Sequence, residues 1–264
     1  MKQHVILSIA GSDNTGGAGI QADIKTACAF SVYAATVITG VTAQNSHGVF
    51  GIEPVSLDLI RRQTDAIFEV MTPGALKTGM LPTPEIIEVV AKLASHYKIK
   101  NLVVDPVMVA TNGGSLTKPG EETVKAFTDY LTPLSTIVTP NMEEASRFLG
   151  LNVAEMDPGH ACEKLLDVFH SHSVLLKGGH RVNGFSTDYL YDGKTMIILS
   201  TPRIDTANTH GTGCTLSTAI ACGLAMGKPL IEAVDNAKSF INKAIGSAVG
   251  LHIMRGPGPL NFFV

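Results

Sequence analysis

Short apolar runs alternate with longer stretches of helical periodicity along this chain of 264 residues. The apolar runs, which we expect to form strands, cover residues 4–11, 34–44, 75–80, 101–109, 135–141 and 173–179. Helical patterns cover residues 19–31, 57–71, 83–97, 214–227 and 230–250. Strands that read as continuous apolar runs are typical of parallel sheets buried on both faces. The alternation therefore predicts an α/β fold in which helices cover both sides of a central, mostly parallel sheet.

A hairpin is expected late in the chain, at residues 188–204. Two apolar stretches of this segment flank Asp192-Gly193, a dipeptide that favours a tight turn between antiparallel strands. No shift of composition, internal repeat or low-complexity tract marks a boundary, so we predict one domain over residues 1–264. In open sheets of this kind, ligands bind outside the carboxyl ends of the strands. The polar residues that follow each apolar run are therefore the candidates for a site.

Charge and hydropathy exclude several classes of protein. The formal net charge is −3, and no basic stripe is visible, which argues against a nucleic-acid partner. No apolar run approaches the length of a membrane span. The four cysteines show neither zinc-ligand nor disulfide spacing, as expected in a reducing compartment. We therefore predict a soluble cytoplasmic protein with neither membrane nor nucleic-acid contacts.

The strongest local signal is segment 205–223, DTANTHGTGCTLSTAIACG, in which Gly211-Thr212-Gly213 leads into an apolar helix. A helix start offers backbone N–H groups without intrahelical partners, and glycines let an anion approach them. The glycines alone fit an ordinary turn equally well. Cys214 favours the anion site, because the helix dipole should lower the pKa of a thiol in the first turn. The thiolate could be a nucleophile or a general base. A phosphoryl group in transfer is a natural anion for such a site, and its transfer depends mainly on positioning and electrostatics, so we prefer the base.

A second glycine cluster, GSDNTGGAGIQAD, follows the first expected strand. Residues 17–22 match the dinucleotide fingerprint G-x-G-x-x-A. However, residues 12–16 separate the match from the strand, and residues 37–46 contain no acid for a ribose. A nicotinamide oxidoreductase is therefore not favoured, and we interpret the cluster as a substrate-side loop.

Polar groups at neighbouring strand ends suggest a magnesium site. Asp105 follows one buried strand, and Asn141 and Glu144 follow the next. Carboxylate oxygens together with a phosphate-binding helix start suit a largely hydrated Mg²⁺. Asn141 and Glu144 could instead form the capping box of a helix. Lys177, at a further strand end, could lie near phosphate or could form a simple salt bridge.

Taken together, these segments resemble one family. The resemblance rests on IAGSDNTGGAGIQADIKT, VTAQNSHGV, KTGML, DPVM, TPNMEEA, LLKGGH and NTHGTGCTLS, which are spread from residue 9 to about residue 218. They are similar to the hydroxymethylpyrimidine/phosphomethylpyrimidine kinases of thiamine synthesis, within the ribokinase-like superfamily. The resemblance implies a three-layer α/β/α sandwich, a homodimer, and use of ATP and Mg²⁺. It also implies two successive phosphorylations, from the pyrimidine alcohol to its monophosphate and then to its diphosphate.

The resemblance also implies roles for individual residues. Gln44 would bind the aminopyrimidine, whose ring edge offers a donor and an acceptor to an amide. The other members of the predicted site are pocket walls Met80 and Val107, loop residues Ala18 and Asp23, base Cys214, anion-hole residues Gly211, Thr212 and Gly213, Mg²⁺ and phosphate groups Asp105, Asn141 and Glu144, and nucleotide-side residues Lys177, Thr209 and Lys238.

Two other functions fit the same segments. Some bacterial pyridoxal kinases share the glycine turn and its cysteine but tend to lack a glutamine at position 44, so Gln44 favours the pyrimidine. A pyrimidine-binding sensor without catalysis would be expected to lose Cys214 or Asp105, and both are present.

Two glycine-bearing loops are candidates for closure over a ligand: the glycines at 16–19 and the loop at 111–115.

Overall fold

The strands join into a single sheet. The computed structural model describes residues 3–108, 116, 120–178 and 184–264, which form a nine-stranded sheet in the order β3-β2-β1-β4-β5-β6-β7-β8-β9. The strands span β1 Val5–Ser12, β2 Tyr33–Asn45, β3 Gly48–Pro54, β4 Ala75–Thr78, β5 Leu102–Val104, β6 Ile137–Val138, β7 Val174–Lys177, β8 Phe185–Tyr191 and β9 Met196–Pro202.

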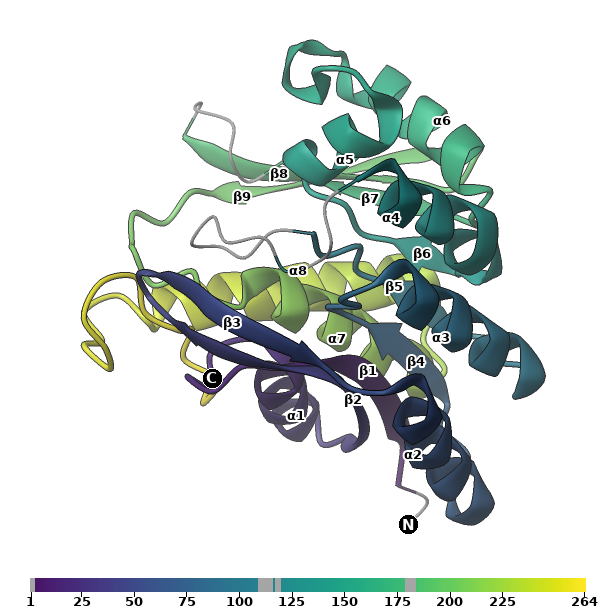
Figure 1. The fold of residues 1–264 in the computed structure, drawn as a ribbon. Coiled ribbons are helices and arrows are strands. Elements are labelled where there is room, and N and C mark those ends of the chain that lie inside the picture. The colour runs from purple at the N-terminus through teal and green to yellow at the C-terminus, as the bar shows by residue number, and fades with distance from the viewer. Residues whose placement is uncertain (1–2, 109–115, 117–119, 179–183) are drawn as a thin grey trace.

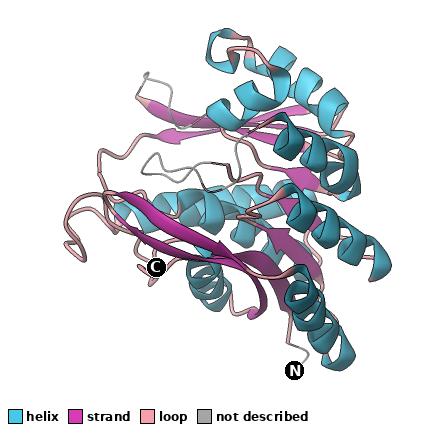
Figure 2. Cartoon of the chain, viewed as in Figure 1, coloured by secondary structure: helices cyan, strands magenta, loops and turns pink. Residues whose placement is uncertain are grey.

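Helices cover both faces of this sheet (Figures 1 and 2). They span α1 Gly19–Ala29, α2 Leu57–Val70, α3 Pro84–His96, α4 Glu121–Ala126, α5 Met142–Leu149, α6 Pro158–Phe169, α7 Thr212–Ala225 and α8 Leu230–Gly246. Helices α1, α7 and α8 share one core with the sheet, and α2 to α6 share the other. No described helix is long and apolar enough to cross a membrane.

The two cores follow from the period of two along a strand. On β1, Ile6 packs towards α1, α7 and α8, while Leu7 and Ile9 pack into the opposite core. On β5, Val103 joins the first core and its neighbours Leu102 and Val104 join the second. Both sides of these strands are therefore apolar, and the expected three-layer α/β/α sandwich with a mostly parallel sheet is confirmed.

The strands from β1 to β7, apart from β3, pair in parallel, and both edges of the sheet are antiparallel. The late hairpin predicted around Asp192-Gly193 is confirmed as β8 and β9. At the other edge, β3 pairs antiparallel with β2, a hairpin that the sequence did not suggest. The chain starts at β1, builds β2 and β3 on one side and crosses to β4 on the other. Such a reversal opens a crevice at the carboxyl ends of the strands.

Candidate active site

The glycine loop after β1 is organised by one carboxylate. Asp13 is 2% exposed and accepts hydrogen bonds from the backbone amides of Thr15 (2.9 Å), Gly17 (3.1 Å) and Ala18 (2.8 Å). It also accepts one from His210 Nε2 at 2.8 Å. Burial alone would raise the pKa of Asp13, but these hydrogen bonds hold it well below its ordinary value. The loop is therefore wrapped around a carboxylate that is ionised at neutral pH.

Helix α7 begins against this loop. Gly211, its N-cap, has a φ of 88°, and a Cβ there would collide with the carbonyl oxygen of Gly17. A Cβ on Gly213 would lie 3.4 Å from Asp105 Oδ2 and 3.6 Å from Lys177 Nζ. The two glycines therefore permit a left-handed cap and a close approach of the helix start to charged side chains. The amides of the first turn have no intrahelical acceptors and can bind an anion here.

Charged groups gather at the carboxyl ends of β5, β6 and β7. Asp105 is 1% exposed and accepts hydrogen bonds from Lys177 Nζ at 2.9 Å, Thr139 Oγ1 at 3.2 Å and Ser217 Oγ at 3.3 Å. Lys177 Nζ also lies 4.0 Å from Glu144 Oε2. Burial would lower the pKa of Lys177, but Asp105 and Glu144 raise it above its ordinary value. Lys177 is therefore a fixed cation beside the start of α7.

The thiol of Cys214 lies in the first turn of α7 and is partly buried. Burial raises its pKa to about 11, against the effect of Lys77, and Asp23 and Asp105 add to the rise. The nearby backbone amide of Gly19 lowers the Cys214 pKa slightly and so opposes part of this rise. The predicted lowering of the Cys214 pKa is wrong, because desolvation and two carboxylates outweigh the helix start.

A fully buried ion pair stands beneath the glycine loop. Lys77 on β4 donates to both oxygens of Asp23 on α1 at 2.9 Å, and neither side chain has exposed area. Asp23 also accepts hydrogen bonds from Ser8 Oγ at 2.5 Å and Thr218 Oγ1 at 2.7 Å. Since Thr218 is four residues after Cys214, it lies on the same side of α7. The pair therefore ties β1, β4, α1 and α7 together below the thiol.

A small apolar cluster adjoins the end of β2. It consists of Met80 and Leu116, with Val49, Ile52 and Val107 packed against them. Gln44 pairs with Val49 across the β2–β3 hairpin, so their side chains project to the same face. Gln44 is 7% exposed, and its Oε1 has no hydrogen-bond partner among the described residues. A buried amide oxygen without a partner beside an apolar cluster is suited to a ligand that carries an N–H group.

Known proteins resemble this chain over its whole length. The family model described as phosphomethylpyrimidine kinase matches residues 13–261. The chain belongs to this family. A hydroxymethylpyrimidine/phosphomethylpyrimidine kinase of Rhizobium meliloti is 46% identical over 261 residues, which are 98% of this chain and 97% of that protein. The enzyme class predicted from the sequence, a kinase, is confirmed by this membership.

Solved structures of phosphomethylpyrimidine kinase and its relatives share the fold. A Bacillus subtilis pyridoxal kinase in an ADP complex has a TM-score of 0.89 and 37% identity, covering 99% of this chain and 98% of that chain. A phosphomethylpyrimidine kinase from Clostridium difficile 630 has a TM-score of 0.78 and 40% identity, covering 92% of this chain and all of that chain (100%). The predicted ribokinase-like resemblance is thus confirmed at the level of the fold.

Several residues predicted for this kinase site come together. Asp105, Glu144 and Lys177 form one cluster beside Gly213 and below the start of α7. Ala18 belongs to the loop that contacts this start, and the carbonyl of Thr209 accepts the amide of Thr212 at 3.3 Å. Met80 and Val107 meet in the apolar cluster beside Gln44. The predicted loop at 111–115 lies outside the described residues.

Three predicted residues have other partners. Asp23 has no exposed area and Lys77 donates to both of its carboxylate oxygens, so this carboxylate is not available to a substrate. Lys238 is 6% exposed and bonds Asp188 Oδ2 at 2.7 Å, because α8 packs beside β8, and its ammonium is therefore not free for a nucleotide. Asn141 caps α5: its Oδ1 accepts the amide of Glu144 at 2.9 Å, and the Glu144 carboxylate accepts the amide of Asn141 at 2.8 Å. The capping-box interpretation is confirmed.

The sequence interpretation missed Asp13 and Lys77, and it named His210 only as a residue that could shape the glycine turn, without its partner. Asp13 and Lys77 lie within the quoted segments, but neither forms a local pattern with its partner. His210 is 197 positions from Asp13 in the chain, so only the fold brings the two together. A signal for Lys77 was available in principle, because a lysine within an otherwise buried strand requires an ionised partner.

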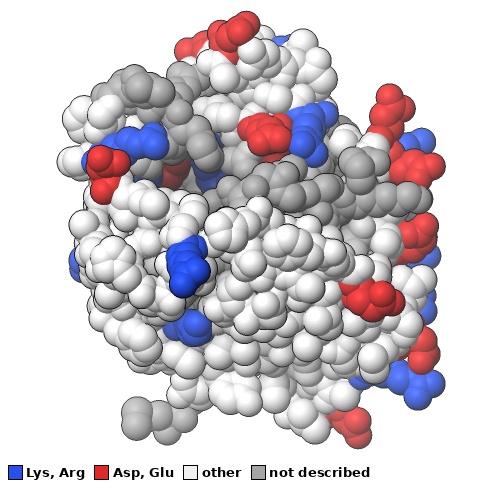
Figure 3. Space-filling model, turned by 60° about the vertical axis from the view of Figure 1, so that its left-hand side comes forward, with Lys and Arg blue, Asp and Glu red and all other residues white. Residues whose placement is uncertain are grey.

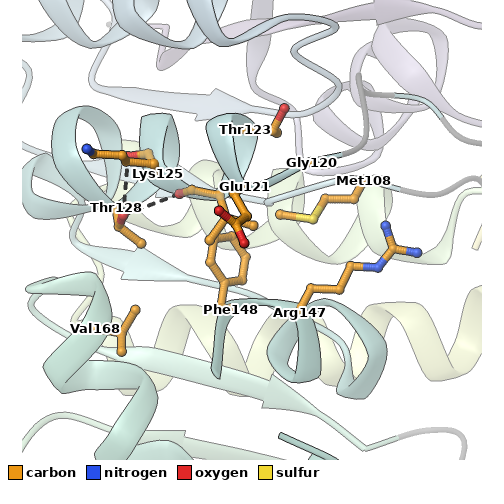
Figure 4. A pocket seen from close by; sticks show the side chains of 10 residues that line it. Met108, Gly120, Glu121, Thr123, Lys125, Thr128, Arg147, Phe148 and Val168 are labelled. Atoms are coloured by element: carbon orange, nitrogen blue, oxygen red, sulfur yellow. Dashed lines mark hydrogen bonds between the residues drawn. The ribbon is translucent and has the colours of Figure 1, made fainter. Parts of the chain in front are cut away.

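A separate pocket lies in the other helical layer, among α4, α5 and α6 (Figure 4). It has a volume of about 590 Å³ and is lined by Met108, Gly120, Glu121, Thr123, Val124, Lys125, Thr128, Arg147, Phe148 and Val168. None of the predicted site residues lines it.

The surface charge is mixed. On the face shown in Figure 3, basic and acidic side chains are dispersed, with no continuous basic area on that face.

Proposed function

We propose that this chain transfers the γ-phosphoryl of Mg·ATP to 4-amino-5-hydroxymethyl-2-methylpyrimidine and then phosphorylates the monophosphate to the diphosphate. The observation that carries the proposal is the unpaired Oε1 of Gln44, buried beside the apolar cluster of Met80 and Val107. An aminopyrimidine edge offers the N–H that this oxygen lacks and a ring nitrogen for the amide NH₂. The methylated ring would pack on the apolar side chains.

Phosphoryl transfer requires positive electrostatics where charge develops. In the proposed arrangement the amides of Gly211 to Cys214 bind the transferred group, and Lys177 supplies a fixed cation beside Gly213. Cys214 would accept the proton of the attacking hydroxyl. Its raised pKa means that the thiol is neutral in the free enzyme at neutral pH, so the thiolate must form during the reaction or from a minor population.

Magnesium is proposed as part of the nucleotide substrate. Asp105 and Glu144 carry the oxygen donors that Mg²⁺ prefers, and both face Lys177. Among the described residues, no group of three or more His, Cys, Asp or Glu could hold a metal ion. Two carboxylates fit Mg·ATP, because this ion takes most of its ligands from phosphate and water. When bound, the ion would neutralise phosphate charge.

Homodimeric assembly, a cytoplasmic location and a single domain over residues 1–264 stay predictions. The single domain is supported by one sheet that contains every strand of the described chain. Use of ATP is supported by the solved ADP complex of the related pyridoxal kinase.

Replacing Gln44 with leucine tests the substrate. We expect kcat/KM for the pyrimidine alcohol to fall about 10–100-fold, since leucine keeps the volume but loses the amide hydrogen bonds. Steady-state assays with varied pyrimidine and saturating Mg·ATP would measure the change. Gln63→Leu is a matched control, because the Gln63 amide only bonds the backbone of Ile38, at 2.9 and 3.1 Å, elsewhere on β2. An unchanged kcat/KM in Gln44→Leu would contradict the proposed pocket.

A further inference from the structure

One hydrogen bond joins the two loops of the candidate site. Asp13 Oδ2 accepts from His210 Nε2 at 2.8 Å, and the same oxygen accepts the amides of Gly17 and Ala18. Because an ionised carboxylate only accepts, Nε2 must carry a proton and be the donor. The glycine loop and the residue preceding Gly211 are thus held by one buried anion.

The position of His210 is itself fixed by a hydrogen bond of its own backbone. Its side chain is 13% exposed, and its backbone amide donates to the carbonyl of Gly258 at 3.1 Å. Gly258 in turn donates its amide to Asn208 Oδ1 at 2.9 Å. A Cβ on Gly17 would collide with the imidazole ring of His210. The ring therefore cannot move towards the glycine loop and cannot turn away without breaking its bond to Asp13.

The loop held by Asp13 contacts both the pyrimidine side and the phosphoryl side of the proposed site. At its start, Asn14 Oδ1 accepts the backbone amide of Gln44 at 2.8 Å, which links the loop to the pyrimidine side. At its other end, the carbonyl oxygen of Gly17 lies so close to Gly211 that a Cβ on Gly211 would collide with it, which links the loop to the phosphoryl side. Neither Asp13 nor His210 has a side-chain role in binding or chemistry under the proposed function.

We infer that Asp13 and His210 are positioning residues that set the distance between the pyrimidine site and the start of α7. The inference rests on the proposed function. The Asp13–His210 hydrogen bond fixes the glycine loop, and the loop fixes the alcohol relative to Cys214 and the anion site. Displacement by about 1 Å at a reacting group can cost about 10²-fold in rate. Loss of this bond should therefore affect the chemical step more than the binding of either substrate.

The test compares His210→Gln with His210→Asn. A glutamine amide can place its NH₂ near the position of Nε2 and keep the donor, whereas asparagine is one methylene shorter and falls short of Asp13. We expect His210→Gln to retain kcat within about threefold and His210→Asn to lose about 10–100-fold, with the KM for ATP unchanged in both. Asp13→Asn should lose at least as much kcat, because in either orientation its NH₂ group would face a backbone amide, that of Thr15 or those of Gly17 and Ala18.

The unfolding midpoint of every variant is measured beside the kinetics. His4→Leu is the control, because its ring bonds the carbonyl of Ala225 at 3.0 Å near the opposite end of β1, and its kcat should equal that of the wild type. Equal kcat in His210→Gln and His210→Asn would overturn the inference. So would a decrease in kcat that is explained in every variant by its lowered unfolding midpoint. A wild-type protein without turnover on the pyrimidine would refute the proposed function instead.

Discussion

Replacing Cys214 with alanine is expected to lower kcat by about 10²–10⁴-fold while leaving the affinity for ATP nearly unchanged. The thiol lies in the first turn of α7, at the anion site and near the backbone amide of Gly19. Removing it takes away the proposed proton acceptor but leaves the amides, Asp105 and Lys177 in place. Pre-steady-state phosphoryl transfer and equilibrium nucleotide binding, measured on the same preparation, separate the two effects.

The pH dependence of the wild type gives a second measurement of the same claim. Since burial raises the pKa of Cys214 to about 11, the reactive thiolate becomes more abundant as pH rises. At low concentrations of both substrates, kcat/KM should increase with pH from neutrality upward, because this parameter reports the free enzyme. Cys222→Ala is the matched control on the same helix: this thiol is fully buried in the α1–α7–α8 core and should not affect the profile. A wild-type kcat retained by Cys214→Ala would contradict the base role.

Replacing Lys77 with methionine is expected to lower the free energy of unfolding by about 3–5 kcal/mol. Lys77 and Asp23 are fully buried, and the ammonium donates to both carboxylate oxygens at 2.9 Å. Methionine fills a similar volume but leaves Asp23 ionised and unpaired, or forces it to take up a proton. Urea unfolding at neutral pH, followed by circular dichroism, would measure the loss.

Two variants serve as controls for the buried pair. The double variant Lys77→Met with Asp23→Leu should recover much of the loss, because an apolar pair leaves no buried charge. Arg62→Met breaks an ion pair whose side chains are 75% and 70% exposed, and it should cost less than about 1 kcal/mol. If Lys77→Met were as mild as Arg62→Met, the Asp23–Lys77 pair would not be the structural link that we describe.

Local patterns in the sequence were sufficient to predict most of the sheet. Strands such as β1 and β7 are buried on both sides and therefore read as mostly apolar runs. The hairpin partner β3 was missed because GVFGIEP contains two glycines and has no residue that is fully buried. Helix α6 was also missed, although Asp157 and Pro158 are a recognisable helix start.

The site was predictable only where one segment carries its own signal. The sequence pattern of residues 211–214 predicts a helix start, and α7 does begin there. Contacts between distant segments have no such signal: Asp23 meets Lys77 from 54 positions away. The thiol pKa was predicted with the wrong sign for the same reason. The helix start is visible in the sequence, but the burial of Cys214 and the nearby carboxylates Asp23 and Asp105 exist only after folding.

The central claim is tested most directly by measuring ADP release from Mg·ATP by the purified protein, with the hydroxymethylpyrimidine and pyridoxal compared as acceptors. We predict turnover on the pyrimidine that continues to a second equivalent of ADP as the monophosphate becomes the diphosphate. Turnover on pyridoxal alone would contradict the proposed substrate and the role of Gln44. If no ADP were released with either acceptor, the kinase function itself would be contradicted.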